Sequence, residues 1–148
     1  MYQRILVPLE NSAYDVAILD HVRRLARLCG ATVRLIHVAD GWVAQHHHEL
    51  HLRESEEMRH DREYLERVAA ELAAEGIGVE AILAGGDPTR EIVAACEREQ
   101  CDLIAMATHG HRFLQDLVRG SVVSGVRHMT ATPLLLVRGS ADAASKPS

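Results

Sequence analysis

The 148-residue chain is 47% hydrophobic but only 3% aromatic, with a formal net charge of -5, which fits one globular domain with an aliphatic core. The acidic balance argues against a nucleic-acid-binding surface, which is normally basic. No apolar run approaches the roughly 20 residues of a membrane-spanning helix, and the N-terminus leads into a strand pattern rather than a signal peptide. We therefore expect a cytoplasmic domain over residues 1–138 and a disordered tail over residues 139–148.

Short apolar runs alternate with helical patterns along the chain. Strands are predicted over residues 4–9, 33–38, 79–83, 103–106 and 134–137, because each is a short apolar run bounded by turn residues. Helical spacing of apolar residues predicts the segments between them to be helical, except for a polar, histidine-rich connection over residues 40–52. Strands that alternate with helices predict an α/β fold, with a parallel sheet covered on both faces.

Turn and cap residues mark several helix ends. Asn11 or Ser12 is expected to cap the first helix, and Gly30 to end it. Asp87 is expected to cap the helix that begins at Pro88. These positions give the predicted helices boundaries that the structure can test.

The three cysteines predict no disulfide framework. Their number is odd, and none of them belongs to a CxxC motif. Cys29 and Cys96 lie on apolar helical stripes, so we expect them to be reduced and buried. Cys101 lies in the loop before a predicted strand, and it is therefore the candidate for a reactive thiol.

The stretch from Ala107 to Ser121 is the main candidate for a ligand site. It follows the predicted strand at residues 103–106 and contains Gly110 and Gly120. A glycine allows close approach of the backbone to a ligand. We expect the next helix to begin at Gly120-Ser121, and the N–H groups of a helix start attract phosphate.

This stretch resembles the glycine signature of the universal stress protein family, Gly-x2-Gly-x9-Gly-Ser/Thr. Gly110, the nine-residue gap and Gly120-Ser121 match, while Ala107 stands at the first glycine. Residues 5–12, 35–38 and 132–137 resemble the first, second and last strands of the family. The resemblance extends over roughly residues 2–138.

The resemblance implies a five-stranded Rossmann-like sheet in the order 3-2-1-4-5. Strands 1 and 4 are then neighbours, and open α/β sheets bind ligands at the carboxyl ends of such strands. Glu10 would accept hydrogen bonds from ribose, Val38 would meet adenine through its backbone, and the N–H groups of Gly110, Ser121 and Val122 would hold phosphates. The nucleotide-binding residues implied are Pro8, Leu9, Glu10, Val38, Met106, Ala107, Gly110, Gly120, Ser121 and Val122.

Two positions depart from the family pattern. Glu10 stands where the nucleotide-binding branch usually carries Asp, which moves the carboxylate one methylene further out. Ala107 replaces a glycine near the expected ribose. If this position needs a positive φ, alanine costs on the order of 1 kcal/mol; if φ is ordinary, the methyl group crowds the sugar.

The chain lacks two commoner phosphate motifs. It has no Gly-x4-Gly-Lys-Ser/Thr, the motif whose lysine reaches the β- and γ-phosphates. The first strand-to-helix turn, Glu10-Asn11-Ser12, has no glycine, which excludes the dinucleotide fingerprint.

A histidine-rich segment over residues 46–51 is the other unusual feature. On a helix, His47, His51 and Glu54 would share one face and could bind zinc or nickel. A solvated polar connection without metal is the alternative. We expect no metal site, and His47 and His51 are the only candidates.

The combined prediction is a universal stress protein that binds ATP, ADP or AMP as a regulatory ligand, with Mg²⁺ arriving on the nucleotide. A homodimer through the last strand is implied by the family, because residues 134–137 would otherwise form an exposed apolar edge. We expect no catalytic residues, no nucleic acid and no membrane. The alternatives are a nucleotide-free dimeric interaction module and a weak ATP hydrolase or metal-dependent hydrolase.

Overall fold

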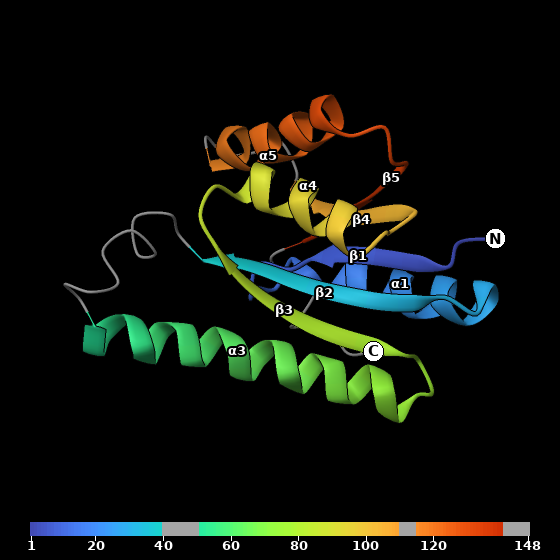
Figure 1. The fold of residues 1–148 in the computed structure, drawn as a ribbon, viewed down its shortest axis with the longest axis horizontal. Helices are drawn as coiled ribbons and strands as arrows, with labels where there is room; N and C mark the ends of the chain where they lie inside the picture. Colours follow the sequence, from blue (N-terminus) through green and yellow to red (C-terminus); the bar gives the residue numbers. More distant parts are fainter. Residues whose placement is uncertain (40–50, 110–114, 141–148) are drawn as a thin grey trace.

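The computed structural model describes residues 1–39, 51–109 and 115–140, together with the side chains of all of these except 51–55 and 115–121. Figure 1 shows its sheet running through the middle of the molecule, with helices on both sides. The strands are β1 Arg4–Pro8, β2 Thr32–Ala39, β3 Val79–Gly85, β4 Leu103–Thr108 and β5 Leu134–Arg138. They form one sheet in the order β3-β2-β1-β4-β5, and the neighbouring pairs are parallel. This confirms the predicted fold class and strand order.

The helices divide between the two faces of the sheet. They are α1 Asp15–Cys29, α3 His51–Ala74, α4 Pro88–Arg98 and α5 Gln115–Met129. The side chains of α1 and α3 pack into one hydrophobic cluster with the sheet, and those of α4 and α5 pack into a second. Figure 1 shows α4 and α5 together on one side of the sheet and α3 on the opposite side.

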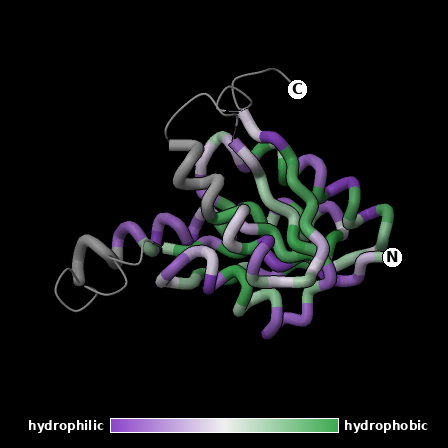
Figure 2. The backbone as a smooth tube through the Cα atoms, turned by 90° about the horizontal axis from the view of Figure 1, so that it is seen from above, coloured by the Kyte–Doolittle hydropathy of each residue, from purple (hydrophilic) through white to green (hydrophobic). Residues whose placement is uncertain are grey.

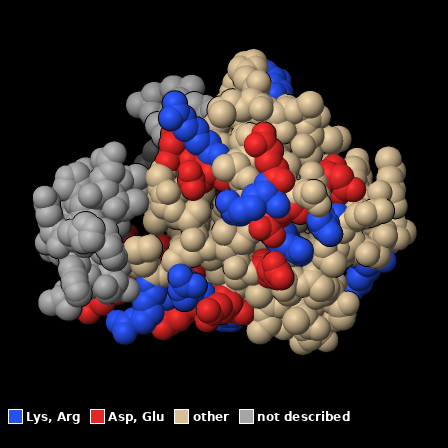
Figure 3. All heavy atoms as spheres, in the orientation of Figure 1, with Lys and Arg blue, Asp and Glu red and all other residues tan. Residues whose placement is uncertain are grey.

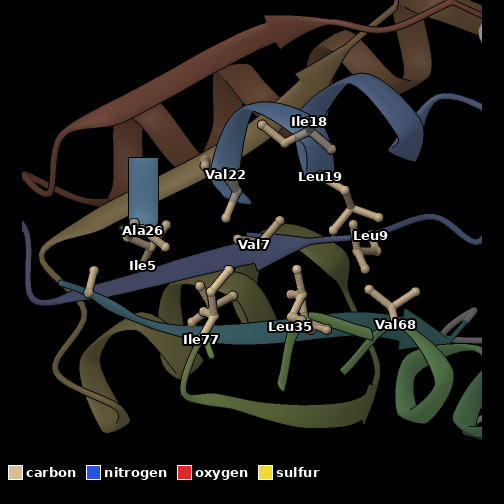
Figure 4. Packing of buried hydrophobic residues seen from close by; sticks show 14 of the residues in the cluster. Ile5, Val7, Leu9, Ile18, Leu19, Val22, Ala26, Leu35, Val68 and Ile77 are labelled. Atoms are coloured by element: carbon tan, nitrogen blue, oxygen red, sulfur yellow. The ribbon is translucent and has the colours of Figure 1, made fainter. Parts of the chain in front are cut away.

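The core is aliphatic, as the composition predicts. Alternate strand residues point to opposite faces, so Ile5 and Val7 of β1 join the cluster under α1 and α3, whereas Leu6 joins the cluster under α4 and α5. Figure 4 shows Val7 between Val22 of α1 and Leu35 of β2. In Figure 2 the hydrophobic segments gather in the interior, while hydrophilic segments lie mainly toward the outside.

The helix ends confirm two predictions and correct a third. Gly30 ends α1 in the left-handed conformation, with a φ of 68°. Asp87 caps α4 by accepting a hydrogen bond from the N–H of Arg90 at 3.0 Å, and Pro88 is the first helical residue. Neither Asn11 nor Ser12 caps α1, whose N-cap is Tyr14 and has no side-chain capping bond. The first N–H groups of the helix donate to backbone carbonyls instead, Asp15 to Ser12 at 3.1 Å and Val16 to Ala13 at 3.3 Å.

Helix α5 begins earlier than predicted. The structure starts it at Gln115, so Gly120 and Ser121 lie inside the helix rather than at its N-terminus. A glycine inside a helix costs only about 1 kcal/mol relative to alanine. The leucine and arginine before Gly120 favour helix, so one glycine does not set the boundary. The prediction that Gly120-Ser121 starts the helix is therefore wrong.

The cysteines are free thiols. Cys96 is buried as predicted, and Cys29 is half-buried. Cys101 is buried rather than exposed in its loop, and that burial, with Cys96 nearby, raises the pKa of its thiol to about 11. A thiol with so high a pKa has little thiolate, which is the reactive form, so the prediction of a reactive Cys101 is wrong.

The described surface carries mixed charge. In Figure 3 acidic and basic side chains are interspersed on the face shown. Arg34, for example, contacts Glu99 at 3.0 Å and Glu80 at 3.3 Å.

Across residues 1–39, 51–109 and 115–140, no helix is long and apolar enough to span a membrane. The candidate metal ligand His47 lies outside the described residues, and His51 lies in α3 without a described side chain.

Candidate functional site

A cleft of about 470 Å³ opens at the carboxyl ends of β1, β2 and β4, on the side of the sheet that α4 and α5 cover. Its described lining residues are Pro8, Leu9, Glu10, Ile36, His37, Val38, Pro88, Ile92, Met106, Ala107, Val122 and Val123. This position, beside the neighbouring ends of β1 and β4, is the one predicted from the strand order.

The cleft brings together most of the predicted nucleotide-binding residues. Pro8, Leu9, Glu10, Val38, Met106, Ala107 and Val122 all line it. Gly110 lies outside the described residues, and Gly120 and Ser121 lie in α5 with side chains that are not described. The structure also adds residues that the sequence analysis did not name, among them Ile92 of α4 and Val123 of α5.

The interior of the cleft is mainly apolar. Ile36, Val38 and Met106 come from the sheet, and Ile92 and Val122 face them from the helices. These side chains belong to the hydrophobic cluster on the α4 and α5 side, or pack against it. An apolar slot between two layers suits a flat ring system that buries both of its faces.

Ala107 does not close the cleft. It belongs to β4, and its side chain packs against the cluster on the α1 and α3 side, whereas the next residue toward the N-terminus, Met106, belongs to the cluster on the cleft side. Among the described non-glycine residues, positive φ angles occur only at Asn11 and Gln100, so Ala107 has an ordinary strand φ. The methyl group therefore points away from the cleft, and Ala107 meets the cleft through its backbone.

Glu10 supplies a carboxylate at the end of β1. His109 contacts it through Nε2, at 3.0 Å from Oε1 and 2.9 Å from Oε2. The hydroxyl of Ser12 donates to Oε2 at 3.1 Å. The side chain of Glu10 is 27% exposed, so it stands at the rim of the cleft rather than in its apolar interior.

The turn that carries Glu10 is fixed by Asp15. The Asp15 carboxylate, which is 1% exposed, accepts from the N–H groups of Glu10 at 3.0 Å and Asn11 at 2.8 Å. Tyr64 of α3 donates its hydroxyl to the same carboxylate at 2.5 Å. Burial, followed by this hydrogen bond, raises the pKa of Tyr64 far above its ordinary value. The bonds to Asp15 compensate the left-handed backbone of Asn11, whose φ is 64°.

His109 is a site residue that the sequence analysis missed. Its imidazole ring stacks on Tyr14, with ring centroids 3.6 Å apart and planes inclined by 20°. The side chain is only 4% exposed. The sequence does place His109 directly after β4, at the edge of the sheet where ligand-binding residues gather. Its contact with Tyr14 could be found only from the three-dimensional structure.

His37 joins the end of β2 to two other segments. Its Nδ1 lies 2.9 Å from the carbonyl oxygen of Leu9, and its Nε2 lies 3.3 Å from Oδ2 of Asp61. The side-chain amide of Asn11 donates to Oδ1 of Asp61 at 3.1 Å. These contacts hold the turn after β1 against α3, and they leave His37 bordering the cleft with both ring nitrogens facing oxygen acceptors.

A smaller cavity of about 220 Å³ lies next to the cleft. Glu10 and His37 line both spaces, and Asn11, Ala39, Glu57, Met58 and Asp61 complete the described lining of the smaller one. Within the described part of the chain, no group of three histidine, cysteine, aspartate or glutamate side chains is arranged to hold a metal ion.

Comparison with known proteins gives a consistent result. The sequence profile of the universal stress protein family matches residues 1–138. The universal stress protein MJ0577 of Methanocaldococcus jannaschii is 29% identical over 158 aligned positions, which cover 93% of this chain and 96% of that protein. Its solved structure superposes with a TM-score of 0.77 at 32% identity, covering 95% of this chain and 98% of the other.

Two further solved structures carry adenine nucleotides. A universal stress protein of Archaeoglobus fulgidus in complex with dAMP has a TM-score of 0.67 and 20% identity, and covers 92% of this chain and 98% of its own. A universal stress protein in complex with cAMP has a TM-score of 0.70 and 18% identity, with coverage of 94% and 98%. At these identities the likeness concerns the fold.

Proposed function

Because the chain belongs to the universal stress protein family, we propose that its cleft binds an adenine nucleotide, ATP or the related ADP or AMP, as a regulatory ligand. The cleft itself carries the proposal: it is an apolar slot at the ends of β1, β2 and β4, with the Glu10 carboxylate at its rim. A flat base fits the apolar slot, and a ribose diol suits the carboxylate. The relatives solved with dAMP and cAMP support the same ligand class.

The orientation of the ligand follows from this division of the cleft. The adenine lies between Val38 and Met106 on the sheet side and Ile92 and Val122 on the helix side. The ribose lies toward Glu10. Ala107 presents backbone rather than a methyl group to the ligand, so its replacement of the family glycine leaves the space for a sugar open.

The phosphates are assigned to the N–H groups of Gly110, Ser121 and Val122, as the resemblance to the family implies. An N–H group inside an α-helix donates to the carbonyl four residues earlier, and Ser121 and Val122 lie inside α5. Phosphate binding by these two N–H groups therefore requires residues 115–120 to leave the helix. Among the described lining residues of the cleft, Glu10 is the only one with a carboxylate that could bind Mg²⁺. Mg²⁺ is thus held mainly by the phosphates of the nucleotide.

The ligand is bound rather than turned over. The titratable side chains among the described lining residues of the cleft are Glu10 and His37. His37 is held by the Leu9 carbonyl and Asp61, and Glu10 by His109 and Ser12. The hydroxyl that contacts Glu10 belongs to Ser12, which is not among the described lining residues of the cleft. His37 contacts a carbonyl oxygen and a carboxylate rather than a nucleophile. Any ATP hydrolysis is accordingly expected to be slow.

The decisive experiment is to denature purified protein and identify any released small molecule by mass spectrometry, and then to titrate the emptied protein with ATP, ADP and AMP by calorimetry. Release or saturable binding of one of these nucleotides supports the proposal. An empty protein that shows neither binding nor a thermal shift with Mg-ATP would instead favour a nucleotide-free interaction module.

A pair of matched variants tests whether the ligand binds in the cleft. Val122→Trp fills the slot and is expected to weaken binding at least about tenfold, because the added ring occupies the volume of the base. Val16→Trp makes the same change on α1, at a valine that is 42% exposed and does not line the cleft. Equal loss of affinity in both variants would contradict the assignment.

Two copies of the chain pair through β5 in this proposal. The strand lies at the edge of the sheet, and Leu136 on it is 46% exposed. An uncovered apolar edge strand tends to pair with another strand, and a second copy offers the same edge.

A further inference from the structure

The carboxylate of Glu10 is oriented by an imidazole that comes from the end of the neighbouring strand. Glu10 follows β1, and His109 follows β4. The Nε2 atom of His109 lies almost equally far from the two carboxylate oxygens, at 3.0 and 2.9 Å. A donor placed between both oxygens fixes the rotation of the carboxylate as well as its position.

His109 is itself held by packing. Its ring lies against the ring of Tyr14, 3.6 Å between centroids, and only 4% of its side chain is exposed. Tyr14 is in turn backed by Gly139, where a Cβ atom would approach the Tyr14 carbonyl oxygen to 2.7 Å. Gly139 also donates its N–H to the carbonyl of Thr108 at 2.8 Å. The end of β5 thus supports the stack between α1 and the end of β4.

A glutamate at this position needs such a support. Its longer side chain has one more rotatable bond than an aspartate, so its carboxylate samples more positions when it is not held. A carboxylate has roughly four lone-pair positions, so it can accept from an imidazole, a hydroxyl and a ligand together. Holding the group in advance lowers the ordering cost that a ligand would otherwise meet.

We propose that His109, held by the Tyr14 ring, is a positioning residue that aims the Glu10 carboxylate at the hydroxyl groups of a bound ribose. This inference rests on the proposed function and adds to it a determinant of sugar specificity. His109 acts through Glu10, so its effect is confined to ligands that carry ribose hydroxyls.

The test compares ATP with 2′,3′-dideoxy-ATP by calorimetry. Wild-type protein is expected to prefer ATP. His109→Ala should weaken ATP binding about five- to tenfold, the effect of losing one well-placed hydrogen bond, and should leave the affinity for the dideoxy nucleotide unchanged. Combining it with Glu10→Gln should weaken ATP binding no further than Glu10→Gln alone, because both changes remove the same interaction.

Two conservative variants distinguish the positioning role of His109 from a general structural effect. His109→Gln carries an amide N–H near the position of Nε2 and is expected to recover most of the ATP affinity. Tyr14→Phe keeps the stacked ring and should bind like wild type, whereas Tyr14→Ala should resemble His109→Ala. Thermal unfolding of each variant verifies that it is folded.

Several outcomes would overturn the inference. His109→Ala that loses affinity equally for both nucleotides would show a general structural role, and one that binds ATP more tightly would show that His109 competes with the sugar. Wild-type protein that binds the two nucleotides equally would also reject it. Wild-type protein that binds neither nucleotide would reject the proposed function itself, and this inference with it.

Discussion

At the scale of single residues, the direction of one methyl group decides whether the cleft can accept a sugar. Ala107 replaces a family glycine, but its side chain belongs to the α1 and α3 side of the sheet. Ala107→Gly is therefore expected to change nucleotide affinity by no more than about twofold, or about 0.4 kcal/mol. It should lower the free energy of unfolding by roughly 0.5–1 kcal/mol, because glycine in a strand loses more backbone entropy.

Calorimetry and chemical denaturation of the same protein check both parts of this prediction. A tenfold gain in affinity on Ala107→Gly would mean that the methyl group does crowd the ligand. Met106→Gly is the matched comparison on the cleft side of the same strand, and there a clear loss of affinity is expected because Met106 lines the cleft.

Cys101 shows why a residue's place in a loop is a poor guide to its reactivity. The loop before β4 is short and turns inward, so its cysteine joins the cluster under α4 and α5. The sequence indicates the loop, but burial depends on how α4 is placed over the sheet.

At the scale of elements, Asp102 anchors the N-terminal strand to the start of β4. Its carboxylate accepts from the N–H of Gln3 at 2.9 Å and from that of Arg4 at 3.0 Å. Burial alone would raise the pKa of Asp102, but the N–H donors of Arg4 and Gln3 outweigh that effect and hold the pKa below its ordinary value. The charged form is thus the one that the folded state favours.

This lowered pKa predicts a pH-dependent contribution to stability. A group whose pKa is lower in the folded state stabilises the fold above its unfolded pKa, near 3.9 for aspartate, and loses this contribution as the pH falls through the folded pKa. Wild type should therefore unfold at a higher temperature than Asp102→Asn at pH 7, and this gap should narrow as the pH falls below the unfolded pKa and through the folded pKa of Asp102.

Thermal unfolding of both proteins between pH 2.5 and pH 7, a range chosen to bracket the titration, measures this gap. Asp20→Asn is the control, because it removes an exposed carboxylate that faces Arg24 on the surface of α1 and should shift the unfolding temperature little at any pH. A gap for Asp102→Asn that persists unchanged at pH 2.5 would contradict the prediction.

The elements also show what the sequence can and cannot predict. Strands were recognisable because a buried parallel strand is rich in apolar residues, and β1 to β5 lie where such short runs occur, although Arg34 and His37 interrupt β2 and Glu80 interrupts β3. Helix starts were less reliable. At α4 the local Asp87-Pro88 signal suffices. Helix α1 begins after Tyr14, which has no side-chain capping bond, and Gly120, predicted to start a helix, lies inside α5.

The site divides in the same way. Glu10, Val38 and Met106 could be placed from the sequence because they end apolar strands and match a family pattern. Tyr14 and His109 could not, because they are far apart in the sequence and meet only when α1 and β4 are packed side by side. Contacts between elements, unlike strand ends, leave no periodic pattern in a sequence.

At the scale of the whole molecule, one face of the sheet is fully packed and the other contains the cleft. The face under α1 and α3 is filled by a large aliphatic cluster, including Val7, Leu35 and Leu72, which are fully buried. On the other face α4 and α5 leave the cleft open at the carboxyl ends of the strands. The filled face supports the sheet from below, and the neighbouring ends of β1 and β4 present Glu10 and Met106 to the cleft on the other face.

The outer edge of the sheet yields the last prediction. β5 is an edge strand, and its exposed Leu136 is expected to pack against a second copy. Light scattering coupled to gel filtration should give wild type close to twice the mass of one chain. Leu136→Glu should shift it to the monomer, because a charge buried between two edges is costly. Leu28→Glu, at a leucine that is 84% exposed on α1, should stay dimeric. A monomeric wild type, or loss of the dimer in both variants, would show that β5 does not form the interface.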